Sequence, residues 1–219
     1  MSNTILKIQN LNLNAGNQAL FKNFSLEVTQ GEIVGFFAPT GSGKTSLFNY
    51  IATTAVVEPV ETTISYVFQE PRLIPSQTVL KDVMLPLENK MDKATAKEIA
   101  IAWLEKLNML HKQNDLAKTL SGGEQQRTSI ARAFAYTTAV PEKITAVPEA
   151  LEGQYKNTLL LLDEPFASQD EANIKNIINL IKQIIAQTDS ACLVISHDLN
   201  ILQSFCTRII TQKDFCVEK

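Results

Sequence analysis

The chain has 219 residues, of which 45% are hydrophobic and 20% are charged, so it can bury a sizeable core as one domain spanning residues 1–219. Its formal net charge of −3 at pH 7 gives no reason to expect nucleic acid or an anionic membrane surface as its main partner. Its apolar runs all fall short of the roughly 20 residues needed to span a bilayer, so we expect any work at a membrane to go through a partner protein.

The first 32 residues predict two antiparallel strands. Residues 5–13 alternate between apolar and polar side chains, as a half-buried strand does, and residues 19–28 are typical of a second strand. Polar turns at residues 14–18 and 30–32 bound them. Because a strand, a loop and a helix follow directly, we expect an α/β core with a small antiparallel β subdomain.

A glycine-rich loop lies between an apolar strand, residues 33–37, and a helix that begins near Thr45. Gly41 and Gly43 allow backbone N–H groups to turn inward around a polyphosphate, where a Cβ atom would obstruct them. The helix N-terminus adds uncapped donors and a partial positive charge. Lys44 would reach the terminal phosphates, and Thr45 would hold Mg²⁺. The predicted phosphate-binding residues are Ala38, Pro39, Thr40, Gly41, Ser42, Gly43, Lys44, Thr45 and Ser46.

One position of this loop departs from the usual pattern, because Ala38 stands where the first glycine is expected. We expect an alanine to be tolerated there if its φ angle is negative. The alternative interpretation of the whole stretch is an ordinary glycine-rich turn before a helix.

The next section is expected to be helical. Residues 64–68 form a short apolar strand that ends at Gln69, and nearby prolines enforce a loop after it. The chain then has no glycine until Gly122, and Thr95 with Glu98 forms a predicted capping box. These features predict a compact helical subdomain over about residues 72–120.

Residues 120–127 open another helix with the sequence Leu-Ser-Gly-Gly-Glu-Gln-Gln-Arg. Ser121 and Glu124 form a capping box, which explains those two residues structurally. It does not explain Gly122 and Gly123, because each glycine costs up to about 1 kcal/mol relative to alanine in a helix. Paired glycines at a helix N-terminus are expected where an anion must approach the backbone.

Two later strands end in polar residues. Residues 158–162 form an unbroken apolar run, typical of a strand buried on both faces, that ends at Asp163 and Glu164. Residues 191–195 form a last buried strand shortly before His197. Ligands of α/β folds bind at the carboxyl ends of strands. The alternatives are a solvated acidic turn and a structural histidine.

The segments between these motifs carry less chemistry. Residues 136–157 contain two Val-Pro pairs and are too long for an ordinary helix–strand link, so we interpret them as an insertion. Residues 168–171 are expected to cap a helix with regularly spaced isoleucines. The three cysteines lack metal-ligand spacing and we expect no signal peptide, which fits a reducing cytoplasm.

Taken in order, these motifs resemble those of the ATP-binding subunit of an ABC transporter over nearly the whole chain. The resemblance runs through the phosphate loop, Gln69, the signature at residues 120–125, the acidic strand end, the loop at 168–170 and His197. The sequence around Gln69 is similar to importers of nitrate, sulfonate and thiamine precursors. The implied fold is α/β, a P-loop NTPase core of the ABC ATPase type with a small antiparallel β subdomain and an α-helical subdomain.

The resemblance implies that two subunits face head to tail and hold ATP between the phosphate loop of one and the signature of the other. Ser121, Gly122 and Gly123 would contact the γ-phosphate of the partner's nucleotide. Asp170 would couple the two sites. Closure of the dimer would pass through the helical subdomain and the Gln69 loop to a membrane permease.

The resemblance also implies the roles of the polar strand ends. Asp163 would orient Mg²⁺, with Thr45 and Gln69 completing its shell. Glu164 would polarise the attacking water, and His197 would contact the γ-phosphate and position that water. The implied catalytic residues are Glu164, His197 and Lys44.

Two further departures from the family pattern concern the β subdomain and adenine. Residues 51–64 are short and free of glycine, so we expect a trimmed β subdomain. The family stacks adenine on an aromatic side chain after the first strand, and alignment places Ala15 there. Adenine is therefore expected to be held loosely. Phe21 is the candidate substitute, although core packing within the second strand is the expected place for it.

The implied location is cytoplasmic, peripheral on the inner face of the cell membrane through the permease. A solute-binding protein would act through that permease, and no nucleic acid is expected. The sequence does not specify the cargo. The alternative functions are an export-type or non-transport ABC ATPase, and a nucleotide-sensing subunit with little hydrolysis. The presence of both Glu164 and His197 argues against the last.

Overall fold

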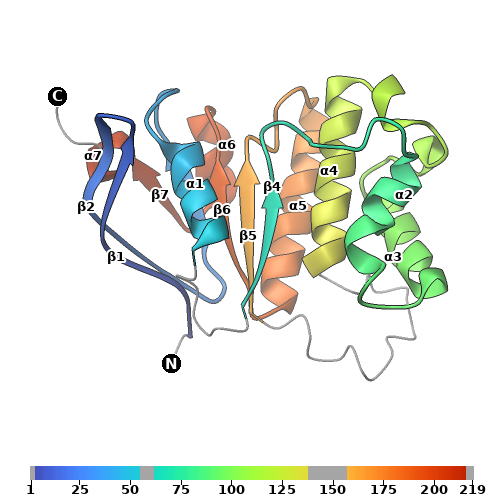
Figure 1. Ribbon diagram of the computed structural model, residues 1–219, viewed down its shortest axis with the longest axis horizontal. Helices are drawn as coiled ribbons and strands as arrows, with labels where there is room; N and C mark the ends of the chain where they lie inside the picture. The colour runs from blue at the N-terminus through green and yellow to red at the C-terminus, as the bar shows by residue number, and fades with distance from the viewer. Residues whose placement is uncertain (1–2, 55–61, 138–156, 216–219) are drawn as a thin grey trace. The chain divides into compact units, whose positions relative to one another are not determined.

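The computed structural model describes residues 3–54, 62–137 and 157–215, which divide into two compact units. The sheet unit comprises residues 3–54, 62–66, 157–164 and 181–215. The helical unit comprises residues 67–137 and 165–180. Figure 1 labels most of the helices and strands of both units.

The elements of the sheet unit are β1 (Thr4–Ala15), β2 (Gln18–Thr29), β3 (Ile33–Phe37), α1 (Lys44–Thr53), β4 (Thr63–Val67), β5 (Thr158–Asp163), β6 (Ala191–Ile195), α6 (Leu199–Phe205), β7 (Arg208–Thr211) and α7 (Gln212–Phe215). Those of the helical unit are α2 (Val79–Met84), the 3₁₀ helix η1 (Leu85–Leu87), α3 (Lys93–Lys106), η2 (Leu110–Lys112), η3 (Ala117–Thr119) and α4 (Gly122–Thr137). Helix α5 (Glu171–Gln187) begins in the helical unit and ends in the sheet unit.

Strands β1 and β2 form the predicted small antiparallel sheet. They pair as a hairpin, with Leu6 opposite Val28 and Ile8 opposite Leu26. Apolar side chains on one face of the hairpin are buried, whereas the polar side chains between them are exposed. This alternation is what a two-stranded sheet with one solvated face requires.

The main sheet has the strand order β4-β5-β6-β3-β7 in the part of the chain that the structure describes. Strands β5, β6, β3 and β7 pair in parallel. In this register Asp163 of β5 and Phe36 of β3 both lie opposite Ile195 of β6. The carboxyl ends of three strands therefore meet along one edge.

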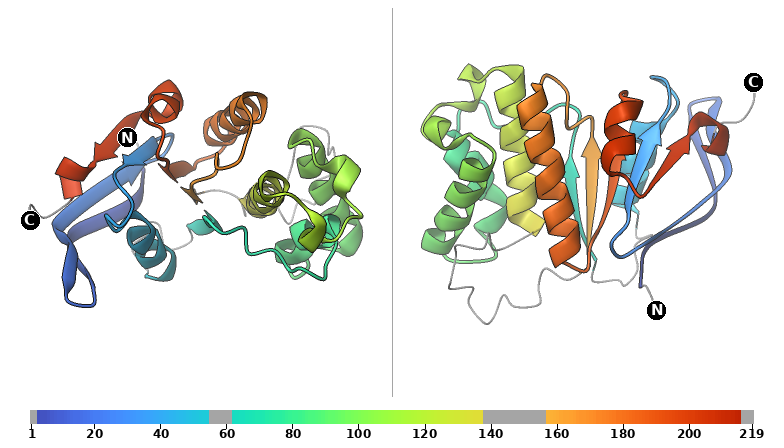
Figure 2. Two further views of the ribbon diagram at one scale, coloured as in Figure 1. Left: turned by 90° about the horizontal axis from the view of Figure 1, so that it is seen from above. Right: turned by 180° about the vertical axis from the view of Figure 1, so that it is seen from behind.

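Strands β5 and β6 are buried along their whole lengths, as their apolar runs predict. Helix α1 lies on one face of the sheet and α6 on the other (Figure 2). The ring of Phe48 in α1 packs edge-on against Phe36, with centroids 5.7 Å apart. Each such fully buried side chain contributes about 1.5–3 kcal/mol to folding, so this core holds the strand ends in place.

The helical unit is formed by α2, α3 and α4, which pack on one another around Trp103 and Phe134, with ring centroids 5.3 Å apart. The capping box predicted at Thr95 is wrong. Helix α3 begins at Lys93, because the carboxylate of Asp92 accepts from the N–H of Ala94 and of Thr95 at 2.9 and 3.1 Å. An aspartate that accepts two first-turn N–H groups is a stronger cap than threonine.

Helix α4 extends through Thr137, so the segment interpreted as an insertion starts later than predicted. Residues 138–156 of that segment lie outside the described residues, as do residues 55–61 of the section where a trimmed β subdomain was expected. Within the described ranges, no helix combines the length and apolar character needed to cross a bilayer.

A buried ion pair ties the helical unit together. Asp82 of α2 is fully buried, and its carboxylate lies 2.7 Å from Arg132 of α4. The same carboxylate accepts from the N–H of Ile74 at 2.7 Å. The Arg132 guanidinium also donates to the carbonyls of Pro71 and Arg72 at 2.8 and 3.1 Å. The segment 71–74 is thereby fastened to two helices.

We expect Arg132→Met to lower the free energy of unfolding by about 3–5 kcal/mol, because Asp82 would remain buried with its charge unpaired. The double variant Arg132→Met with Asp82→Asn should lose much less, since it buries no charge and keeps an acceptor for Ile74. Urea denaturation followed by the fluorescence of Trp103, the single tryptophan, measures both. The single variant Asp82→Asn is measured as well. If the double variant loses as much unfolding free energy as the two single variants lose together, the charge pair does not couple these residues.

Candidate functional site

The phosphate loop joins β3 to α1 and ends in a helix terminus with no cap from a side chain. Gly43 is the N-cap residue, and the first turn of α1 has no acidic residue. The first N–H donors of α1 and its partial positive charge are therefore not neutralised by a local carboxylate. Gly43 has a φ of 94°, and a Cβ atom there would lie 3.0 Å from Leu20 and from Phe21. Only glycine fits this position.

Ala38 takes the place of a glycine without strain. Its backbone is not among those with positive φ, whereas Gly41 and Gly43 have φ angles of 81° and 94°. The two glycines that the loop conformation requires are thus both present. The backbone condition under which alanine was expected to be tolerated at position 38 is therefore met.

The ammonium group of Lys44 is held inside this loop. Its Nζ donates to the carbonyls of Ala38 and Pro39 at 2.5 and 2.9 Å, and approaches the hydroxyl of Ser42 at 3.4 Å. The side chain is buried. Since phosphate oxygens bind an ammonium group more strongly than neutral carbonyls do, the loop keeps Lys44 ready for a phosphate.

Asp163 and Thr45 present two oxygen atoms side by side. The Thr45 hydroxyl donates to Asp163 Oδ2 at 2.8 Å. Burial raises the pKa of Asp163, while the Thr45 hydrogen bond and the charge of Lys44 act in the opposite direction. A hydroxyl and one carboxylate fit Mg²⁺, which is usually held by one or two carboxylates plus substrate phosphates. Within the described ranges, no group of three or more His, Cys, Asp and Glu side chains is placed to hold a metal by itself.

Glu164 and His197 meet at the ends of β5 and β6. His197 Nε2 lies 3.1 Å from Glu164 Oε1. Burial raises the pKa of Glu164 to about 7; the backbone N–H of His197 opposes this shift, and the charge of Asp163 adds to it. Glu164 also has a φ of 50°. A non-glycine residue pays roughly 1–3 kcal/mol for such a conformation, which is typical of functional sites. A carboxyl group with a pKa near neutrality suits a general base.

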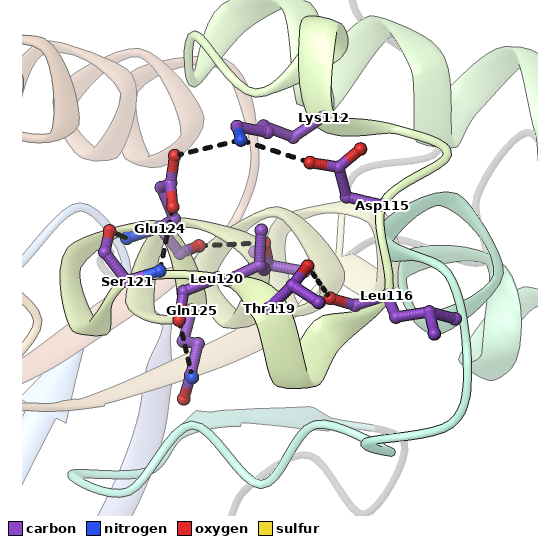
Figure 3. Close-up of polar contacts among 9 residues, drawn as sticks. Lys112, Asp115, Leu116, Thr119, Leu120, Ser121, Glu124 and Gln125 are labelled. Carbon is purple, nitrogen blue, oxygen red and sulfur yellow. Dashed lines mark hydrogen bonds and ion pairs between the residues drawn. The ribbon is translucent and has the colours of Figure 1, made fainter.

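The signature turn, residues 120–125, belongs to the helical unit, and its polar contacts are drawn in Figure 3. The Ser121 N–H donates to Glu124 Oε2 at 2.8 Å, and the Glu124 N–H reaches Ser121 Oγ at 3.4 Å. The predicted capping box is confirmed. Lys112 lies 3.1 Å from Asp115 and 3.9 Å from Glu124. The turn is therefore fixed before any ligand arrives.

Gly122 and Gly123 of the signature turn differ in why glycine is required there. Gly122 is exposed, and a Cβ atom there would meet only the Ser168 hydroxyl, 3.9 Å away. A Cβ atom at Gly123 would lie 2.5 Å from the backbone oxygen of Ser168, which no side chain could tolerate. Close packing is thus sufficient to require Gly123. Access of an anion to the backbone therefore remains the explanation for Gly122 alone.

The loop that follows Glu164 contacts α4. Asp170 Oδ1 accepts from the Asn173 N–H at 2.8 Å, and this backbone hydrogen bond is the main cause that lowers the pKa of Asp170. Asp170, within the segment 168–171 that was predicted to cap this helix, is therefore the residue that caps α5, which begins at Glu171. Ser168 lies two residues before the cap and has a left-handed φ of 59°. Gln69 is exposed in the helical unit. The residue before it, Phe68, has the Arg72 guanidinium stacked 3.8 Å over its ring.

The structure thus gathers the predicted residues into two groups. In the sheet unit, five side chains meet at the carboxyl edge of the sheet, Lys44, Thr45, Asp163, Glu164 and His197. The rest of the predicted phosphate loop, residues 38–43 and Ser46, also belongs to the sheet unit, whereas the helical unit contains Gln69, Ser121, Gly122, Gly123 and Asp170. Gln169 lies in the loop at 168–170 through which the resemblance runs, but no role was predicted for its side chain, which contacts Gly123 and Arg127. These partners are 46 and 42 residues away, so no local pattern predicts the contacts.

Comparison with known proteins yields one consistent family. A family model described as ABC transporter matches residues 21–140. The arginine transport ATP-binding protein ArtM of Bacillus subtilis is 27% identical, with 94% of this chain and 86% of ArtM aligned. The aliphatic sulfonates import ATP-binding protein SsuB 1 of Nocardia farcinica is 30% identical, with 94% and 76% aligned. A solved dimer of the ATP-binding cassette MJ0796, in a post-hydrolysis state bound to ADP and Pi, matches with a TM-score of 0.78 at 27% identity and covers 98% of this chain and 97% of that one.

We expect Glu164→Gln to stabilise the protein at pH 8 but not at pH 5, in buffer without nucleotide or Mg²⁺. The folded-state pKa of Glu164 is raised from 4.5 to about 7, so the fold prefers the protonated carboxyl. Stability is therefore lost as pH rises through this interval, on the order of 2 kcal/mol, and a neutral amide escapes that loss. Urea unfolding at both pH values measures the difference.

The matched control is Glu171→Gln at the exposed start of α5, where an ion pair with Lys175 lowers the carboxyl pKa. It should show no gain at pH 8. An equal effect of Glu164→Gln at both pH values would contradict the raised pKa.

Proposed function

The chain belongs to the ABC transporter family, and from this premise we propose that it is the ATP-hydrolysing subunit that powers import of a small solute through a membrane permease. The observation that carries the proposal is the meeting of Lys44, Thr45, Asp163, Glu164 and His197 at one edge of the sheet. Import is favoured over export by the relatives, which include arginine transport and sulfonate import proteins.

The phosphate loop binds the substrate, ATP. The N–H groups at the start of α1 and the Lys44 ammonium hold the β- and γ-phosphates, replacing the carbonyls of Ala38 and Pro39 as partners of Lys44. Thr45 and Asp163 would hold Mg²⁺, and the family pattern assigns Gln69 to the same ligand shell. When bound, this ion neutralises charge on the phosphate oxygens.

Glu164 and His197 orient and activate the attacking water. Glu164 accepts a proton from the water while the water oxygen forms a bond to the γ-phosphorus. In line with it, the bond from this phosphorus to the bridging oxygen breaks, and ADP leaves. His197, 3.1 Å from Glu164, holds the water and the γ-phosphate in that geometry. Because the transition state needs little covalent help from protein groups, positioning and charge stabilisation dominate.

A second copy of the chain completes the site. Ser121, Gly122 and Gly123 face the γ-phosphate of the partner's nucleotide, and Asp170 couples the two sites. ATP binding closes the dimer and hydrolysis opens it, as is consistent with the dimeric cassette of similar fold. The subunit acts at the inner face of the membrane through its permease, which receives solute from a binding protein. Co-purification from membranes identifies that permease.

We expect Glu164→Gln to bind ATP normally, to accumulate as an ATP-bound dimer and to hydrolyse ATP at least about 10²-fold more slowly, the lower range for loss of a general base. Phosphate release measures turnover, and size-exclusion chromatography measures the dimer. Glu98→Gln at an exposed position of α3 removes the same single negative charge and serves as the matched control. Turnover near the wild-type rate in Glu164→Gln would contradict the role of Glu164 as general base. A wild type that does not hydrolyse ATP would favour a nucleotide-sensing subunit.

We expect ATP and GTP to bind within about tenfold of each other, about 1.4 kcal/mol. Ala15 is exposed at the end of β1, whereas Phe21 is only 1% exposed and packs against Phe24. Phe21 is therefore a core residue, and the position that the alignment assigns to the stacking aromatic holds the methyl group of Ala15. A stacked ring is worth about 1–3 kcal/mol, so Ala15→Tyr should raise ATP affinity at least about fivefold.

Titration of both nucleotides against wild type and variant tests this expectation. Ala186→Tyr, the same substitution at an exposed site of α5, should leave both affinities unchanged. A wild type that already prefers ATP strongly over GTP would show that another group reads the base.

A further inference from the structure

We propose that Gln169 is a positioning residue that locks the signature turn to the loop 168–170 and thereby sets the strength of the ATP-dependent dimer. This inference rests on the proposed function and names a residue to which neither the motifs nor the relatives assign a role. We call the arrangement the Gln169 tether. It consists of Gln169, Gly123 and Arg127, all within the helical unit.

Both ends of the Gln169 amide are used. Its Nε2 donates to the backbone carbonyl of Gly123 at 2.9 Å, and its Oε1 accepts from Arg127 NH1 at 2.8 Å. A weaker contact joins Nε2 to the carbonyl of Ala167 at 3.4 Å. The position needs a donor and an acceptor about 2 Å apart, which an amide supplies and which neither a carboxylate nor an apolar side chain can.

The backbone of the loop 168–170 lies in direct contact with the first turn of α4. The backbone oxygen of Ser168 lies 2.5 Å from where a Cβ atom of Gly123 would be, so the loop rests directly on the first turn of α4. Ser168 takes a left-handed φ of 59° to reach this contact. A loop held at that distance cannot shift without moving the turn.

The positive charge of Arg127 acts on a carboxylate in the signature turn and on one in the loop. The pKa values of Glu124 and Asp170 are lowered mainly by hydrogen bonds, and the charge of Arg127 lowers both further. The guanidinium therefore interacts with both carboxylates while it holds Gln169. The tether links the two parts of the chain to which the proposed function gives contacts with the partner subunit.

Preorganisation explains how such a tether would act. A surface whose parts are already fixed relative to one another loses less conformational freedom on association. Without the tether, the signature turn and the loop 168–170 would have to be positioned relative to one another when the dimer closes. The phosphate loop and Lys44 belong to the sheet unit, so binding of ATP to the monomer does not depend on the tether.

The test uses Glu164→Gln, in which ATP-bound dimers accumulate, and adds Gln169→Met, which keeps side-chain length but has neither donor nor acceptor. Sedimentation velocity with ATP gives the dimer dissociation constant. Nucleotide titration at a protein concentration below dimerisation gives the ATP affinity of the monomer. We expect the dimer to weaken about three- to tenfold, the equivalent of one or two net hydrogen bonds, and the monomer affinity to stay unchanged.

A second variant and a control sharpen the result. Gln169→Glu keeps the acceptor for Arg127 but loses the donor to Gly123, so it should weaken the dimer as well, again without effect on the monomer. Gln183→Met, the same change at an exposed site of α5, should change neither constant.

The outcomes separate the two proposals. If the Glu164→Gln parent does not dimerise with ATP, the proposed function fails and the tether with it. If the parent dimerises and both Gln169 variants dimerise equally well, only the tether is overturned. A loss of monomer ATP affinity parallel to the loss of dimer would also overturn it, because it would reveal a general structural defect.

Discussion

The register of the parallel sheet is the constraint on which the candidate site depends. Asp163 and Phe36 lie opposite the same residue of β6, so three strands end along one edge. From that edge leave the phosphate loop, the acidic pair and His197. A slip of one residue in β5 would turn Asp163 to the other face of the sheet, away from the Thr45 hydroxyl. Because β5 and β6 are apolar on both faces, their hydrophobic pattern does not itself select this register. The close packing of their buried side chains against the rest of the core opposes a slip.

Several groups at this edge of the sheet destabilise the folded state. Asp163 is a buried carboxyl, Lys44 a buried ammonium, and Glu164 adopts a left-handed backbone conformation. Each of these features opposes folding when considered alone. They persist because the apolar core of the sheet unit overdetermines the strand ends that carry them. Residues held in this way are oriented for binding and proton transfer, which is typical of an enzyme active site.

In the sheet unit the strand register fixes the positions of the functional segments. In the helical unit, long-range polar contacts fix them. Arg132 fastens segment 71–74 to α2 and α4, and Gln169 fastens the loop after β5 to the start of α4. Buried polar groups that are fully paired specify one arrangement of the elements that carry them. The signature turn is thus presented as a fixed surface. Such rigidity suits a turn whose proposed ligand belongs to a second copy of the chain.

The sequence by itself determined what depends on neighbours within a few residues. The spacing from Gly41 to Thr45, the apolar runs of β5 and β6, and the capping box of Ser121 and Glu124 were all predicted, because local backbone geometry and burial dictate them. Only the tertiary structure decided that Gly123 is required by Ser168 and that Gln169 joins Arg127. Those contacts join residues more than 40 positions apart, and the path of the chain, which no local pattern encodes, brings them together.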